Sequence, residues 1–474
     1  MTIAKIFNAT LIDAPTPHAL RVRENVYCVI TDDGVIGQIC NNESELREEF
    51  RRLLPAVEKM RGTQVLIPGL VDLHIHAPQF KQLGTKTDIP LMEWLQKYTF
   101  PAEAAFSSPS HAKQIYPKLT THLLKNATTT AVLYGSNHLE ATKILANCCF
   151  EAGIRAFVGK TCADMLTPDY YVETTEGSLK DTEEFVKWCF EKWGSGKDAV
   201  VRPVITPRFI PTCSKELLKG LGDISKKYNC FVQSHAAESV DEEALVEIQH
   251  PGQRDVEIYN ETGLLGDKTI LAHCCRLKDA EVGVMESIGS AVVSCPWSNI
   301  LFARATVPIP HYQATFPNLK IGLGTDVAGG FGTMLDNMRT AILQDRIDSF
   351  ATVNRSSNVT ESDIKAEKWT VDFKYAFHLA TASGARALGM EDMIGKFEEG
   401  MKWDAVELDL AMDESGEGDS LCDRRQRFTR FGDESVAELF EKWVTTGDDR
   451  NVRRVWVNGK ACNEKLDVSK ISAE

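Results

Sequence analysis

Long apolar runs and an excess of basic residues are both missing from this chain. No run of about 18 apolar residues occurs in its 474 residues, so we expect no transmembrane helix. The first residues lack the basic start and long apolar stretch of a signal peptide, so a cytoplasmic location is expected. With 53 basic against 67 acidic residues the net charge is −14, which argues against a nucleic-acid partner and an anionic membrane surface.

Cysteine pairs at the spacing of metal sites or disulfide frameworks are missing too. Thirteen cysteines are scattered without a CxxC pair, an odd number that favours reduced thiols in a cytosolic enzyme. One zinc deaminase signature joins H-x-E to a later P-C-x-x-C. His138 and Glu140 supply its first half, but the chain has no P-C-x-x-C, so we interpret that half as a coincidence.

Both ends of the chain have a pattern typical of β-structure. Short apolar segments alternate there with turn residues, and Asp33-Gly34 and Asn458-Gly459 are hairpin signals. We expect residues 1–67 and 395–474 to pair into one small β-sandwich domain. The acidic, Gly- and Ser-rich stretch 413–420 is predicted to be a solvated surface segment.

Between residues 68 and 394, apolar or β-branched runs alternate with longer helical stretches. The predicted strands are the run that ends at His76 and residues 127–134, 154–160, 199–206, 230–235, 269–273, 291–295 and 320–326. Eight strands alternating with helices predict an α/β fold, a (β/α)8 TIM-like barrel. A doubly wound sheet is the alternative.

Histidines stand at several predicted strand ends. His74 and His76 are two apart, so they project from the same face of their strand. An isolated pair of this kind is more often two satisfied core histidines. His235, His273 and Asp326 end three further strands, however, and the carboxyl ends of barrel strands meet at one mouth. Imidazoles and a carboxylate suit a divalent ion such as zinc.

The motifs around these residues resemble the guanine deaminases, a family within the amidohydrolase superfamily. The resemblance runs through essentially the whole chain, and its most specific parts are Trp-Leu-x-Lys-Tyr-Thr-Phe-Pro, Pro-Arg-Phe and Thr-Asp-Val-Ala-Gly-Gly. The segments that carry it are residues 68–76, 93–103, 126–130, 206–209, 234–235 with Glu238, 322–330 and 447–451.

The resemblance implies one Zn²⁺ per subunit and assigns its ligands. Metal ligands are expected at His74, His76, His235 and Asp326, with His273 as a possible ligand or a group that orients water. Two-metal relatives carry a bridging Lys or Glu on the fourth strand, and residues 200–206 offer neither. Lys160 is a rival ligand that we interpret as structural. Asp326 is also expected to act as a base, and Glu238 to carry a proton to the ring and to departing ammonia.

The resemblance also implies hydrolysis of guanine to xanthine and ammonia in purine catabolism, by a homodimer. Arg208 offers donors to the 6-oxo group of guanine, Gln79 offers a donor and an acceptor, and Phe209 offers a flat apolar face. The expected substrate site also includes four residues next to the metal: His76, His235, Glu238 and Asp326. Two alternatives stay open: an aminohydrolase of another purine, a pterin or a triazine, and a non-catalytic scaffold.

Two residues depart from the family pattern close to the expected site. Relatives usually have Asn at the position of Trp297 and Gly at the position of Cys274. Both follow predicted strands, so either departure could change the shape of the pocket or the rate. Neither removes an expected metal ligand. Trp94 belongs to a segment that is expected to cover the pocket.

Overall fold

The computed structural model describes residues 3–52, 56–60, 62–355, 370–410, 428 and 430–462. The segment 413–420 therefore lies outside the described residues. Among them, two compact units separate: one holds residues 3–71, 123–129 and most of the chain after 340, and the other holds residues 72–122 and 130–340. The boundaries expected at residues 67/68 and 394/395 stay a prediction.

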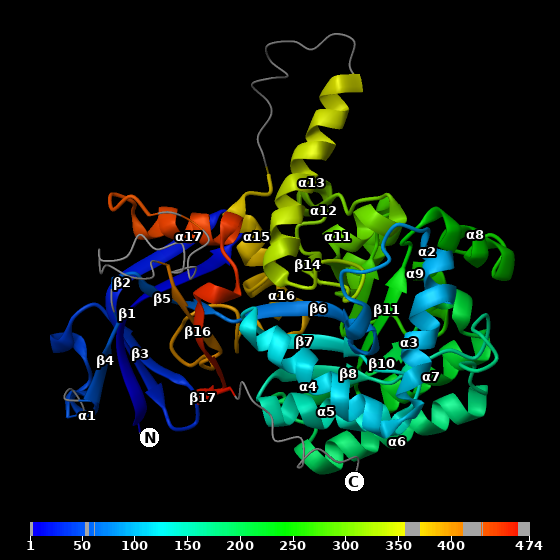
Figure 1. Cartoon of the computed structure of the whole chain (residues 1–474), viewed down its shortest axis with the longest axis horizontal. Coiled ribbons are helices and arrows are strands. Elements are labelled where there is room, and N and C mark those ends of the chain that lie inside the picture. The colour runs from blue at the N-terminus through cyan, green and yellow to red at the C-terminus, as the bar shows by residue number, and fades with distance from the viewer. Residues whose placement is uncertain are drawn as a thin grey trace. The chain divides into compact units, whose positions relative to one another are not determined.

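The first unit is built on a mixed sheet with strands from both ends of the chain (Figure 1). In spatial order its main path runs β17-β16-β15-β5-β1-β2-β3, and β4 pairs with β1. Ile67 of β5 lies opposite Val406 of β15 in an antiparallel register, so the expected pairing of the two chain ends is confirmed. The bounds are β1 Ile3–Thr16, β2 Ala19–Thr31, β3 Ile36–Cys40, β4 Val57–Lys59, β5 Gln64–Pro68, β15 Ala405–Asp409, β16 Val452–Val457 and β17 Lys460–Ala461.

Aromatic packing and tight turns hold this sheet together. Phe7 stacks on Trp403 at 5.5 Å between ring centroids and meets the edge of Trp456 at 5.7 Å. Asn458 and Gly459, with φ of 49° and 75°, form the predicted turn between β16 and β17. The helical segments that involve this unit are η1 Glu43–Glu45, α1 Glu48–Arg51, α13 Met334–Arg355, α15 Phe373–Leu379, α16 Ala382–Ala387, α17 Val436–Thr446 and η8 Asp449–Asn451.

The second sheet is the predicted barrel. Its order is β14-β13-β12-β11-β10-β8-β7-β6, with the short β9 paired to β10, and the pairs from β7 to β14 are parallel. The amide of Asp326, just after β14, donates to the carbonyl of His74 in β6 at 2.8 Å, which brings the two ends of the sheet together. The bounds are β6 Leu70–His76, β7 Thr128–Tyr134, β8 Arg155–Gly159, β9 Thr161–Cys162, β10 Val201–Pro207, β11 Phe231–Ala236, β12 Thr269–His273, β13 Ala291–Ser294 and β14 Lys320–Leu323.

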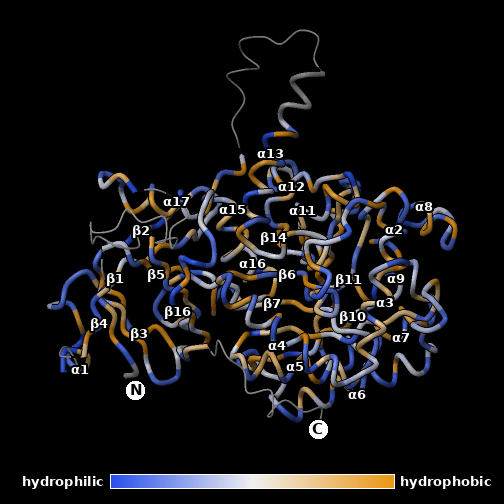
Figure 2. Tube along the Cα trace, in the orientation of Figure 1, coloured by the Kyte–Doolittle hydropathy of each residue, from blue (hydrophilic) through white to orange (hydrophobic). Residues whose placement is uncertain are grey.

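Every residue of β6, β7, β11 and β12 is buried, as expected for parallel strands covered on both faces. Hydrophobic residues, orange in Figure 2, concentrate along the strands. The connecting helices are α4 Pro109–Lys125, α5 Leu139–Ala152, α6 Thr175–Trp193, α7 Lys215–Tyr228, α8 Val240–Gln249, α9 Asp255–Glu261, α10 Asp279–Ile288, α11 Pro296–Ser298 and α12 Ile309–Thr315.

A long insertion of short helical turns follows β6. It consists of η3 Ala77–Gln82, α2 Leu91–Trp94, the π-helical η4 Leu95–Thr99, α3 Phe100–Ala104 and η5 Ala105–Ser107. Two further short segments, η6 Ile210–Thr212 and the π-helical η7 Asn299–Ala303, follow β10 and α11. In the described part of the chain no helix is both long and apolar enough to cross a bilayer.

Candidate metal centre and its pocket

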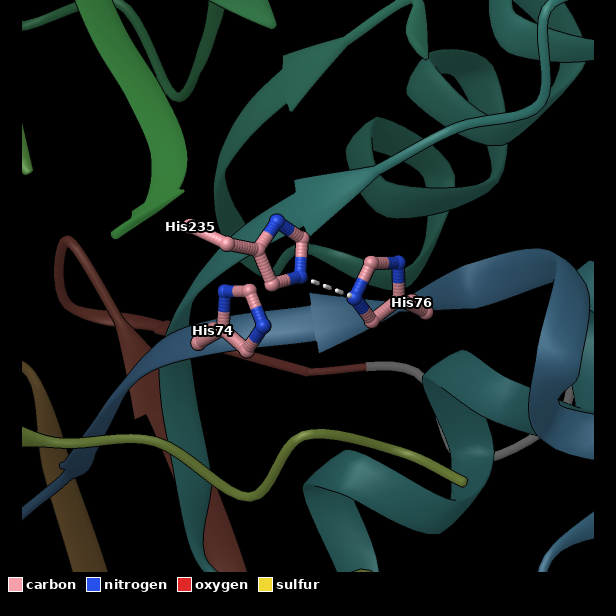
Figure 3. A group of neighbouring side chains, drawn as sticks. All are labelled: His74, His76 and His235. Atoms are coloured by element: carbon pink, nitrogen blue, oxygen red, sulfur yellow. Dashed lines mark hydrogen bonds between the residues drawn. The ribbon is translucent and has the colours of Figure 1, made fainter. Parts of the chain in front are cut away.

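Four ligand atoms converge at the carboxyl ends of β6, β11 and β14. His76 Nε2 lies 3.0 Å from His235 Nε2, and Asp326 Oδ1 lies 3.2 Å from His74 Nε2 and 3.4 Å from His76 Nε2. The facing rings of His76 and His235, with His74 beside them, are drawn in Figure 3. All four side chains are buried and belong to the second compact unit.

These separations fit one small divalent ion. Ligand atoms about 2.0–2.1 Å from a tetrahedral ion lie about 3.3–3.4 Å from one another. His74 Nε2 is buried and has no hydrogen-bond partner among the described residues, as a ring nitrogen reserved for a metal would have none. The ligand atoms of His74, His76 and His235 all lie within 4.8 Å of one another. The donor set therefore fits the ion that the sequence predicts.

The protonation states also suit ligands. Burial lowers the pKa of His74, and it lowers the pKa of His76 and His235 far below the ordinary value, so these imidazoles are neutral at pH 7. Burial alone would raise the pKa of Asp326, but the surrounding histidines, His74 first and then His273 and His76, outweigh burial and hold that pKa well below its ordinary value. Neutral imidazoles and an ionised carboxylate are the forms that bind metals.

Hydrogen bonds behind the ligands fix their orientation. His235 Nδ1 donates to the backbone carbonyl of Arg208 at 2.6 Å, which leaves Nε2 with its lone pair toward the site. Asp72 joins β6 to the segment after β14: its Oδ1 accepts from the amides of Thr325 at 3.0 Å and His74 at 3.2 Å. Its Oδ2 accepts the hydroxyl of Thr325 at 2.7 Å. Asp326 is thereby held beside His74.

His273 lies next to the four ligand atoms but is turned toward other groups. Its Nδ1 contacts Asn299 Oδ1 at 2.8 Å, and its Nε2 lies 3.8 Å from Glu238 Oε2. A second cluster of possible ligand atoms joins His74 and His273 to Cys295. Burial raises the pKa of Cys295 far above its ordinary value, so this thiol is protonated and a poor ligand. Sequence reasoning missed Cys295 and Asn299.

Glu238 follows β11 in a loop that points its carboxyl group into the pocket. The preceding Ala237 has a φ of 47°, and the amide of Glu238 donates to Glu242 Oε2 at 2.6 Å. Burial raises the pKa of Glu238, an effect only partly opposed by the charge of His273. A carboxyl group with a raised pKa can hold and release a proton near neutral pH.

A cavity of about 410 Å³, including its mouth, opens beside the metal ligands. The predicted residues Gln79, Arg208, Phe209, Glu238 and Trp94 line it, and Leu91 and Leu95 of the insertion were not predicted. Its full lining is His76, Gln79, Leu91, Trp94, Leu95, Arg208, Phe209, His235, Glu238, His273 and Asp326. The structure thus brings the predicted substrate residues to one pocket with three of the four predicted metal ligands, and the fourth, His74, lies beside Asp326.

Lys160, the rival ligand, is turned away from this cavity. Its buried ammonium forms an ion pair with Glu173 and donates to the carbonyl of Thr161 at 3.3 Å. Trp297 and Cys274, which depart from the family pattern, do not belong to the lining either. Trp297 packs against Phe331, with 4.3 Å between ring centroids.

The fold and this donor set are typical of metal-dependent hydrolases, and known proteins were compared with the chain on that basis. The amidohydrolase family matches residues 65–462, so the chain belongs to that family and is a hydrolase. It is 33% identical over 470 residues to a guanine deaminase of Dictyostelium discoideum, covering 96% of this chain and 98% of that one. It is 35% identical over 463 residues to the guanine deaminase of Homo sapiens, covering 97% and 96%.

Solved structures agree with this placement. A crystal structure of guanine deaminase from C. acetobutylicum, with guanine bound in its active site, matches the present fold with a TM-score of 0.82. The two are 31% identical, and the match covers 97% of this chain and 100% of the other.

Proposed function

We propose that this protein is a zinc-dependent guanine deaminase, which converts guanine and water to xanthine and ammonia. One observation carries the proposal: a fitting set of metal ligands shares a small buried pocket with a carboxyl group of raised pKa and with Arg208. The relatives described above are named guanine deaminases, which supports guanine as the substrate of this protein.

We propose His74, His76, His235 and Asp326 as the ligands of a single zinc ion. The ion would lower the pKa of a water molecule in the pocket to about 7 and so supply the nucleophile. A single ion is supported by Lys160, whose ammonium is engaged by Glu173 and cannot bridge two metals. His273 is the possible fifth contact, and its 3.8 Å approach to Glu238 favours a role in orienting water.

The side chains of the pocket account for each proton. Water adds to C2 of guanine: Asp326 accepts a proton from it, and Glu238 delivers a proton to the ring nitrogen next to C2. The bond from C2 to the exocyclic nitrogen then breaks. The departing amine receives, through Glu238, the proton that Asp326 took from water, and it leaves as ammonia. The remaining proton of the added water passes to Glu238 and restores its acid form, so the oxygen stays on C2 as the new carbonyl of xanthine.

Recognition of the base is assigned to Arg208, Gln79 and Phe209. A donor aimed at the 6-oxo group rejects bases that lack it, because that buried donor is then left unpaired. Arg208 is only 3% exposed, so an unpaired guanidinium nitrogen there is costly. This selectivity argues against a triazine as substrate.

The test uses purified protein with its natural metal complement. Elemental analysis should find about one zinc per chain, and guanine should yield equal amounts of xanthine and ammonia while adenine and pterins yield none. His235→Ala and Asp326→Ala should lose both metal and turnover, whereas His311→Ala, at an exposed histidine paired with Asp279, should keep both. Full activity of either ligand variant would refute the metal assignment, and ammonia release from adenine alone would refute the substrate.

A homodimer in the cytoplasm completes the proposal. Both properties come from the resemblance to the family. Sedimentation equilibrium of the purified protein would check the first, and imaging of the tagged protein in its cell would check the second.

A further inference from the structure

A buried carboxylate outside the pocket lining connects the two polar residues proposed to recognise the base. Glu103 lies in α3 and is 1% exposed. Its Oε1 accepts Gln79 Nε2 at 2.9 Å, and its Oε2 accepts the guanidinium of Arg208 at 2.5 Å. Oε2 also accepts the hydroxyl of Tyr171 at 2.7 Å. Three donors from distant parts of the chain therefore share one carboxylate.

Helix α3 restrains Arg208 on two sides. Phe100 and Glu103 are three residues apart and so lie on the same face of the helix. The guanidinium carbon of Arg208 is 5.1 Å from the centre of the Phe100 ring, while its Nη1 bonds Glu103. Burial alone would lower the pKa of Arg208, but the charge of Glu103 and its hydrogen bond, together with the nearby Tyr171 and Tyr134, outweigh burial and raise that pKa. Arg208 is thus fixed in place with its other nitrogens available to a ligand.

Gln79 is oriented by the same carboxylate. Because Glu103 only accepts hydrogen bonds, it fixes which end of the Gln79 amide is turned toward it. The nitrogen faces Glu103, and the oxygen lies 3.4 Å from the amide nitrogen of Ala328. The remaining N–H and the second lone pair of the oxygen are what Gln79 can offer in the pocket.

We infer that Glu103 is the positioning residue of base recognition: it holds Arg208 and Gln79 in the one arrangement that matches a 6-oxopurine. The inference rests on the proposed function. Glu103 does not line the cavity, so it acts through the two residues that do. The segment 93–103, which marks the resemblance to the guanine deaminases, thereby acquires a physical role.

Two variants separate the effect of the charge of Glu103 from the effect of its side-chain length. Glu103→Gln keeps the length of the side chain but removes the charge and presents donors to Arg208. Glu103→Asp keeps the charge but shortens the side chain, so it cannot meet all three donors. Glu173→Gln is the matched control, because it also deprives a buried cation, Lys160, of its partner without contacting Arg208 or Gln79.

The readout compares guanine with 2-aminopurine, which is guanine without the 6-oxo group. Both Glu103 variants should keep their zinc and raise KM for guanine about tenfold or more, with a smaller change in kcat. Their preference for guanine over 2-aminopurine, as the ratio of the two kcat/KM values, should fall by a similar factor. Glu173→Gln should keep the wild-type ratio even where its melting temperature falls.

The outcomes distinguish this inference from the proposed function. Wild-type protein that forms no xanthine from guanine would refute the proposed function and this inference with it. An active wild type with an unchanged ratio in Glu103→Asp would refute the inference alone, because charge without reach would then suffice. If Glu103→Gln fails to fold, Glu103→Asp decides by itself.

Discussion

At the scale of single residues, the surroundings of Glu238 separate it from an ordinary surface carboxylate. It is 7% exposed, its pKa is raised by burial, and its backbone amide is held by Glu242. Asp326, in the same pocket, has its pKa held well below the ordinary value by His74. Two carboxyl groups whose environments push their pKa values in opposite directions can take the roles of acid and base.

Glu238→Gln is expected to keep the metal and lose most of the rate. The amide has the same size and can stay in the loop after Ala237, but it cannot deliver a proton, so kcat should fall about 10²- to 10⁴-fold. Zinc content by elemental analysis and xanthine formation check this. Glu247→Gln, at an exposed glutamate of α8, is the matched control and should keep full activity. A metal-free Glu238→Gln protein would contradict the placement of Glu238 as a proton carrier.

The family's glycine at position 274 has a conformational reason that the residue here does not satisfy. Cys274 has a φ of 55°, a backbone conformation that favours glycine. Its Sγ contacts the backbone carbonyl of Leu271 at 3.4 Å and does not line the cavity. Cysteine in place of glycine therefore changes the conformational energy of the backbone in the turn after β12. It does not change the surface that meets the substrate.

Some site residues could be predicted from the sequence and others could not. The proximity of His74, His76, His235 and Asp326 could be predicted, because each lies near or just after the carboxyl end of a strand, and strand ends of a barrel meet. Glu103 and Asn299 could not, since each is placed at the site by contacts with side chains far along the chain. No periodicity in the sequence reports which distant donors a buried carboxylate will meet.

At the scale of elements, β6 and β14 approach each other closely because β14 is followed by a glycine. A Cβ on Gly324 would lie 2.6 Å from the Cβ of His74 and 3.0 Å from its backbone nitrogen. Those atoms belong to a buried strand and cannot move aside easily. The glycine is thus part of what places His74 beside Asp326.

Gly324→Ala is expected to displace His74 and weaken metal binding. Zinc affinity should fall at least tenfold, as for loss of a group that orients a ligand, while circular dichroism stays close to wild type. Competition with a chromophoric chelator measures the affinity. Gly283→Ala in α10 is the control, because its added Cβ would meet only Phe316 at an ordinary 3.5 Å and should leave affinity unchanged. Equal affinities of the two variants would refute the packing argument.

Elements with a strong period were predicted well and irregular ones were not. The strand predicted at residues 269–273 is β12 residue for residue, and the others agree within a few residues. The short β9 and the π-helical η4 at residues 95–99 were missed. The form of η4, whose Leu95 packs in the cluster of Trp94, Phe100, Tyr171 and Phe302, depends on contacts that local propensity does not encode.

At the scale of the whole molecule, Asp255 and Glu242 are buried without an ion-pair partner among the described residues, and this affects how stability depends on pH. Asp255 is 3% exposed, and burial, together with the charge of Glu281, raises its pKa to about 7. Burial also raises the pKa of Glu242 far, with the charge of Asp255 adding to it. Glu242 Oε1 and Asp255 Oδ2 have no hydrogen-bond partner among the described residues. Ionising either group in the folded state is therefore unfavourable.

The sign of the resulting pH dependence follows from linkage. The unfolded chain releases the proton of Asp255 near pH 4, whereas the folded protein keeps it until about pH 7. Between these values the folded state binds more protons, so the free energy of unfolding falls as pH rises, by at most about 1.4 kcal/mol per pH unit for this group. Above pH 7 the contribution is constant.

Asp255→Asn should remove this loss. Asparagine cannot ionise but can still accept the hydrogen bond that Asp255 accepts from the amide of Ala237. The variant should therefore melt at higher temperature than the wild type, and the difference should widen as the pH rises from 5 to 8. Differential scanning calorimetry of both metal-loaded proteins at pH 5, 6, 7 and 8 measures the difference, in which effects of pH on metal binding cancel.

Asp267→Asn, at an exposed aspartate, is the control and should follow the wild type at every pH. A constant difference between Asp255→Asn and wild type across this range would show that Asp255 is already ionised in the folded protein at pH 5.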